Sequence, residues 1–157
     1  YTAQNLGAGK KERIREGFGA GIRLIWLLCV PIVLLYLLTG KALVDFFMDV
    51  PTEAALSSGL WFLRIVAPFY FVISVKLVAD GILRGAGMMD KFMISTFTDL
   101  ILRVVLTRIL AGIMGPIGIW CAWPVGWTIG MALSVIFYRK GFGKFFKKDC
   151  KKRENSL

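Results

Sequence analysis

Four ionisable side chains interrupt long apolar stretches of this sequence, and their spacing could do chemistry. Lys76 and Asp80 are four residues apart, and so are Asp99 and Arg103. Residues four apart lie on one face of a helix, so each acid would have a base beside it. A charge in the middle of a hydrocarbon layer costs about 2.5–3.5 kcal/mol on insertion scales. These four groups therefore need partners or a water-filled cavity.

Two interpretations of these charges stay open. One is a structural clamp that locks two helices together, and the other is a proton or coupling-ion site. Asp80 and Asp99 are the only acids within the long apolar stretches, but an acid neutralised by a base binds cations poorly, which favours the clamp. A tight turn expected after Gly85 brings Lys76 to the depth of Asp99, and Asp80 towards Arg103. We therefore expect one buried cluster of two acids and two bases, between the second and third helices below.

The remaining residues offer no catalytic arrangement. The chain has no histidine, and its three cysteines lack C-x-x-C spacing, which disfavours a metal site. The stretch AQNLGAGKKERIREG, residues 3–17, mixes glycine with lysine as phosphate-binding loops do. It fails the P-loop pattern, because Gln4 and Lys11 stand where that pattern needs glycine and serine or threonine. We expect no catalytic residue, no metal and no cofactor, and thus no enzyme.

Composition indicates lipid as the environment. Of the 157 residues, 57% are hydrophobic, and the formal net charge is +10. A soluble domain is usually about 45–50% apolar. A nucleic-acid-binding domain gathers its basic residues on one polar face. Here they form blocks between apolar runs, so we expect membrane lipid as a partner and no nucleic acid.

The apolar runs predict an all-α membrane protein with four transmembrane helices. A bilayer core of about 30 Å needs about 20 apolar residues as helix. Four stretches have that length, at about residues 17–40, 56–85, 92–114 and 116–138. Residues 1–16 are expected to form a cytoplasmic loop that leads into the first helix, and residues 139–157 a basic cytoplasmic tail. Turns are expected at GAGMMDK and GIMGPIG, and a short interfacial helix within residues 39–53.

The basic residues predict the orientation. Five lie in the N-terminal segment through Arg23, two flank the GAGMMDK turn and eight lie in the tail, all on one side of a four-span chain. The positive-inside rule then places both ends in the cytoplasm. Gly126 and Gly130 form a G-x-x-x-G pattern that permits close helix packing. Trp120, Trp123 and Trp127 are expected to form an interface belt or to line a substrate cavity.

Several stretches, in this order, resemble the MATE (multidrug and toxic compound extrusion) transporters. They are AQNLGAGKKERIREG, LRIVAPFYFVISVKLVADGILRGAG and TDLILRVVLTRILA followed by GPIGIW, and the likeness covers essentially the whole chain. The motif residues are Gln4, Asn5, Gly7, Gly9, Arg84, Gly85 and Gly87. The resemblance implies a twelve-helix fold of two lobes, of which this chain is the C-terminal portion, the last four helices.

The resemblance also implies a function. Members are multidrug efflux antiporters of the cell membrane, which export organic cations or amphipathic compounds in exchange for protons or sodium. The expected partners are a missing N-terminal lobe and a small cationic substrate. Sodium-coupled members carry an acid about three turns before L-R-G, whereas residues 71–75 here contain none. Two alternatives stay open: a flippase for lipid-linked oligosaccharides, whose anionic headgroups would suit Lys76 and Arg103, and a non-transporting membrane module.

Overall fold

The computed structural model describes residues 1–47 and 52–154, with side chains described through Phe142. The elements in chain order are α1 (Thr2–Gly7), α2 (Lys11–Phe46), α3 (Glu53–Val66), the short 3-10 helix η1 (Ala67–Phe69), α4 (Tyr70–Gly85), α5 (Met89–Met114) and α6 (Pro116–Glu154). Every regular element in these ranges is a helix, which confirms the all-α prediction.

Local sequence explains where the helices begin and end. Thr52 caps α3, because its side-chain oxygen accepts a hydrogen bond from the Ala55 amide. Pro68 lies in η1, which interrupts the second apolar run between α3 and α4. Gly87 and Gly115 make the turns on either side of α5 with positive φ angles of 74° and 63°. The two turns expected from glycine and proline are therefore confirmed.

Three segments are more helical than the sequence suggested. Residues 2–7 form α1 within the expected loop. α2 continues to Phe46, so no separate interfacial helix precedes residues 48–51, which lie outside the described residues. α6 continues from the expected span into the basic tail. At the ends of α2 and α6 no proline stops the chain, so an existing helix extends at little cost, whereas α1 is a separate short helix.

Within the described residues, three helical segments are long and apolar enough to cross a membrane: α2, residues 53–85 and residues 116–142. α5 has 26 residues, which is sufficient length, but Asp99, Arg103 and Arg108 interrupt its apolar run. The fourth span therefore stays a prediction.

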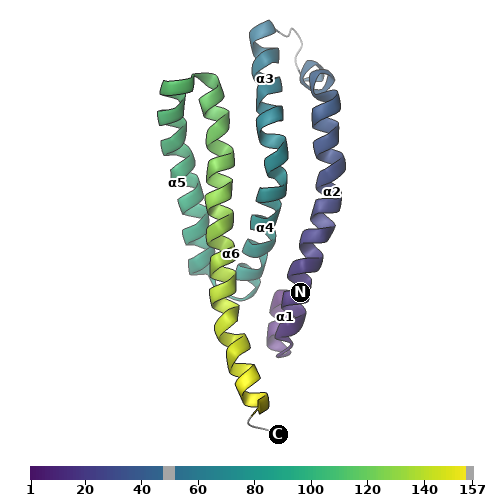
Figure 1. Cartoon of the computed structure of the whole chain (residues 1–157), viewed down its shortest axis with the longest axis vertical. Coiled ribbons are helices and arrows are strands. Elements are labelled where there is room, and N and C mark those ends of the chain that lie inside the picture. Colours follow the sequence, from purple (N-terminus) through teal and green to yellow (C-terminus); the bar gives the residue numbers. More distant parts are fainter. Residues whose placement is uncertain (48–51, 155–157) are drawn as a thin grey trace.

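The long helices lie side by side as an elongated bundle (Figure 1). α6 packs along both α5 and α4, whereas α4 and α5 touch each other little. α1, the turn between α4 and α5, and the C-terminal end of α6 gather at one end of the bundle (Figure 1). There Ile14, Ile82, Tyr138 and Phe142 form a hydrophobic core from three helices. This arrangement brings the basic stretches to one end, and it puts α6 at the centre of the buried charges.

Candidate functional site

Lys76 and Asp80 of α4 form a fully buried ion pair. They are 4% and 2% exposed, and Lys76 Nζ lies 2.6 Å from Asp80 Oδ2. The other carboxylate oxygen, Oδ1, accepts a hydrogen bond from Ser134 Oγ of α6 at 2.5 Å. Both oxygens of Asp80 are therefore satisfied, by a base on its own helix and a hydroxyl on the next.

A pair of serines extends this network to α5. Ser95 Oγ lies 2.6 Å from Ser134 Oγ and 3.0 Å from the Gly130 carbonyl oxygen. Ser134 has one proton, which it donates to the acceptor-only carboxylate of Asp80, so the single proton of Ser95 serves two acceptors, Ser134 Oγ and the Gly130 carbonyl oxygen. Hydrogen bonds thus run from α5 through α6 to Asp80 on α4. Both serines are completely buried.

Asp99 and Arg103 of α5 form the second ion pair, and it is less complete. Arg103 Nη2 donates to Asp99 Oδ2 at 2.9 Å. Asp99 Oδ1 and Arg103 Nε are both buried and have no hydrogen-bond partner. The guanidinium carbon of Arg103 lies 4.6 Å from the ring centre of Trp123 on α6, a cation–π distance. Asp99 thus keeps one free carboxylate oxygen in a buried position.

Two glycines of α6 make room for these side chains. A Cβ on Gly130 would lie 2.7 Å from Lys76 Cε and 3.1 Å from Asp99 Cβ. A Cβ on Gly126 would lie 2.7 Å from Asp99 Oδ1. The G-x-x-x-G pattern therefore lets α6 pass between the charged residues of α4 and α5.

The structure differs from the expected cluster in one respect. Lys76 and Asp99 both contact the position of Gly130, in keeping with their expected common depth. No ion pair joins Asp80 to Arg103 in the described part of the chain, and each acid pairs within its own helix. The physical reason is that α6 packs between α4 and α5, so the cluster belongs to three helices rather than two.

Sequence reasoning missed three members of the site: Ser95, Ser134 and the ring of Trp123. A signal existed for Ser134, because it extends the spacing of Gly126 and Gly130 by four more residues. Ser95 precedes Asp99 by four residues and so shares its face. Nothing in the sequence indicated which tryptophan would meet Arg103.

The tryptophans point into the bundle. The sequence had allowed two alternatives for them, an interface belt or the lining of a substrate cavity. Trp127 is 7% exposed and lies 6.0 Å from Tyr70 and 5.8 Å from Trp123, between ring centres. Phe62 of α3 contacts both Trp120 and Trp123. These rings form a continuous aromatic row, and Arg103 lies over Trp123 in the middle of it.

The expected motif residues lie in α1 and around the turn between α4 and α5, at the end of the bundle where the basic stretches gather (Figure 1). Gly85 packs against α1, because a Cβ there would lie 2.8 Å from Thr2 Cβ. Asn5 is buried and donates from Nδ2 to the Tyr1 carbonyl oxygen, next to Gln4. Gly9 has a φ of 70°, like Gly87 in the second motif, while Gly7 ends α1. Arg84 lies over the ring of Phe92. The two motif stretches therefore meet through Thr2 and Gly85, as a packing contact away from the charge cluster.

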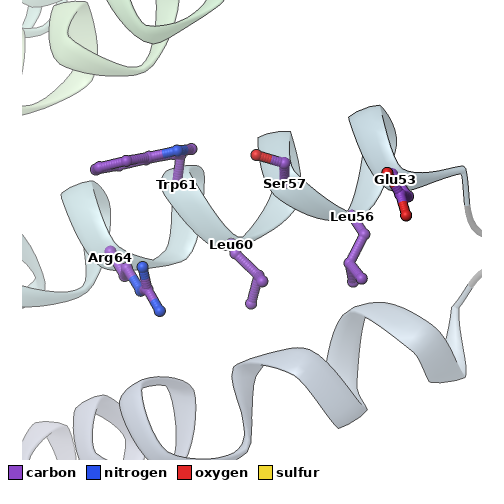
Figure 2. A pocket seen from close by; sticks show the side chains of 6 residues that line it. All are labelled: Glu53, Leu56, Ser57, Leu60, Trp61 and Arg64. Atoms are coloured by element: carbon purple, nitrogen blue, oxygen red, sulfur yellow. The ribbon is translucent and has the colours of Figure 1, made fainter.

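A shallow depression of about 220 Å³ lies along α3, and Figure 2 shows its lining. Its residues are Glu53, Leu56, Ser57, Leu60, Trp61 and Arg64. Trp61 and Ser57 point to one side of α3, and Leu60 and Leu56 to the other (Figure 2). Because all six belong to one helix and the depression is open, it lacks the enclosure of the buried network.

Metal-ligating side chains do not gather in the described ranges. No group of three or more histidine, cysteine, aspartate or glutamate residues there is placed to hold a metal ion. The buried network therefore offers ion pairs, hydroxyl groups and one carboxylate oxygen without a hydrogen-bond partner.

Comparison with known proteins identifies the family. The chain is 26% identical over 147 residues to the "Probable multidrug resistance protein YpnP" of Bacillus subtilis (strain 168), an alignment that covers 93% of this chain and 33% of that protein. The chain thus spans about a third of the length of this curated relative. No solved structure shows a significant match. The model of the MatE family matches residues 1–109, and this chain of membrane helices therefore belongs to the MatE family of transporters.

Proposed function

We propose that this chain is part of an efflux antiporter that expels organic cations or other amphipathic compounds in exchange for protons or sodium ions. The observation that carries the proposal is the buried acid–base network within apolar helices. Ionisable groups inside a membrane protein are rare and typically mark ion or substrate pathways. The multidrug resistance named for the YpnP relative supports the same class of activity.

The two acids have different roles in this proposal. Asp80 acts as the clamp, since Lys76 and Ser134 satisfy both its oxygens. Asp99 takes part in ion coupling, since its Oδ1 is buried and free to bind a proton or to face a cation. An ion bound there would compete with Arg103 for the charge of Asp99. Movement of α5 against α6 would follow, because Arg103 also contacts Trp123 of α6.

Because the relative is about three times as long, the proposed translocation path also needs a second lobe outside these residues. We place the chain in the cell membrane with both ends in the cytoplasm. The basic stretches of residues 10–23, the turn after Gly85 and the C-terminal part of α6 support that orientation, since they lie at one end of the bundle (Figure 1).

Export of a fluorescent cationic dye from bacterial cells that lack their own efflux pumps tests the proposal. Expression of the full protein should lower dye retention, and a protonophore or removal of sodium should abolish the effect and identify the ion. Asp99→Asn should reduce export at least about tenfold, while Asp90→Asn, at the exposed start of α5, should not. Dye retention that stays unchanged on expression would refute efflux, and an accompanying cell-wall defect would favour the flippase.

A further inference from the structure

Asp99 and Trp123 together offer the two features that proteins use to bind organic cations, a carboxylate and an aromatic face. Both are occupied by the same group of the chain itself. Arg103 Nη2 donates to Asp99 Oδ2 at 2.9 Å, and the guanidinium carbon lies 4.6 Å from the centre of the Trp123 ring. Arg103 therefore stands where a ligand cation would stand.

The guanidinium is held loosely by its carboxylate. Arginine and carboxylate commonly pair through two parallel hydrogen bonds. Here Arg103 Nε and Asp99 Oδ1 are both buried without a partner, although each is what the other needs for a second bond. Contact with the indole ring thus replaces the second hydrogen bond. A group held by one hydrogen bond and a ring face is easier to displace than a bidentate pair.

The surroundings permit such a displacement. The Asp99 side chain is 7% exposed, whereas that of Arg103 is 23% exposed and reaches the surface of the bundle. The free oxygen, Oδ1, packs against Gly126, since a Cβ there would lie 2.7 Å from it, so a ligand would reach Asp99 through the Oδ2 that Arg103 now occupies. Arg103 can leave the ring while Asp99 and Trp123 stay in place.

We propose that Asp99 and Trp123 form a cation-binding site whose resident occupant is the guanidinium of Arg103, and that an organic cation binds by displacing it. The inference rests on the proposed function for the class of its ligand. It adds that the chain carries its own competitor, so Arg103 sets the affinity of the site.

Binding of methylguanidinium to the full protein in nanodiscs tests this directly, with sodium chloride at equal ionic strength as the reference. Arg103→Ala vacates the site and should bind methylguanidinium at least about tenfold more tightly than the wild type. Addition of Trp123→Leu to Arg103→Ala should remove that gain. Arg108→Ala, which removes an exposed arginine from the same helix, should bind as the wild type does.

Arg103→Gln is the second variant and the milder one, because it keeps a hydrogen-bond donor for Asp99 and loses only the charge. It should also bind methylguanidinium more tightly than the wild type, because a neutral amide competes less well for Asp99. Equal affinity in the wild type, Arg103→Gln and Arg108→Ala would overturn the inference. Dye export separates the two proposals: a tight site in a protein that exports no dye refutes only the efflux function, and dye export without the site refutes only this inference.

Discussion

The two buried acids differ in how completely their oxygens are satisfied. Asp80 bonds to Lys76 and Ser134, and it joins α4 to α6. Asp99 bonds to Arg103 through one oxygen only. A buried charge whose hydrogen bonds are all formed stabilises one arrangement of the structure. Binding of a proton or a ligand to an unsatisfied buried charge is favourable, because it supplies the missing partner. This difference is why the proposed function gives Asp80 the role of a structural clamp and Asp99 a part in ion coupling.

Asp80→Asn should destabilise the protein by about 3–5 kcal/mol, because it leaves Lys76 buried without a counter-charge. The free energy of unfolding in detergent measures the loss. The double variant Lys76→Met with Asp80→Leu is the control. It removes both charges and should regain most of the stability. Equal losses in the single and double variants would show that the ion pair is not the cause.

Gly130→Ala should cost about 1–3 kcal/mol, since its methyl group would overlap Lys76 Cε and crowd Asp99 Cβ. Gly81→Ala on α4 is the matched control, because a Cβ there meets no atom within 4 Å. It should be neutral or stabilise the helix by roughly 0.5–1 kcal/mol. The melting temperatures of the two variants measure the difference. Equal melting temperatures would mean that α6 does not pass so close to Lys76 and Asp99.

At the scale of elements, α6 organises the structure. It packs on α5 and α4, donates from Ser134 to Asp80 and supplies the ring beneath Arg103. Its start is tied to the end of α5 by Gly115, whose φ of 63° and ψ of −144° belong to a region that only glycine adopts readily. The register of α6 against α5, and thus the site, depends on this turn.

Gly118→Ala should destabilise the turn by about 1–3 kcal/mol or more, because the new Cβ would overlap the backbone carbonyl of Leu110. A backbone atom cannot turn aside as a side chain can. Gly112→Ala lies in the same region with no atom within 4 Å and should fold normally. Thermal unfolding of the two variants compares them, and similar midpoints would contradict the close approach of α5 and α6.

At the scale of the whole molecule, the basic residues predict an orientation in the membrane, and α5 is the long helix that falls outside the three segments apolar enough to span it. Three charged residues, Asp99, Arg103 and Arg108, interrupt its apolar run. Only two of them, Asp99 and Arg103, face a partner within the bundle. We expect α5 to cross the membrane with α6 beside it, since the ion pair and the contact with Trp123 lower the cost of these charges.

Single cysteines at the two ends of α5 test this topology, in a background without Cys29, Cys121 and Cys150. Asp90→Cys and Met114→Cys should react with a membrane-impermeant maleimide from opposite sides of the membrane. Lys140→Cys should react from the same side as Asp90→Cys. Reaction of Asp90→Cys and Met114→Cys from one side would show that α5 does not span.

Much of the fold could be predicted because its signals are local. Apolar length indicates helices, Gly87 and Gly115 mark turns, and spacing of four residues pairs Lys76 with Asp80 and Asp99 with Arg103. Hydropathy and charge also indicate a membrane environment and its asymmetry. These features depend on residues close together in the chain, where periodicity and steric preference act directly.

The tertiary structure alone decided how these pieces meet. Only packing inserts α6 between α4 and α5, separates Asp80 from Arg103, and brings Ser134 and Trp123 to the charges. Helix packing depends on the summed shape of many side chains far apart in sequence, so no short pattern reveals it. For the same reason, only the tertiary structure shows that one oxygen of Asp99 has no hydrogen-bond partner.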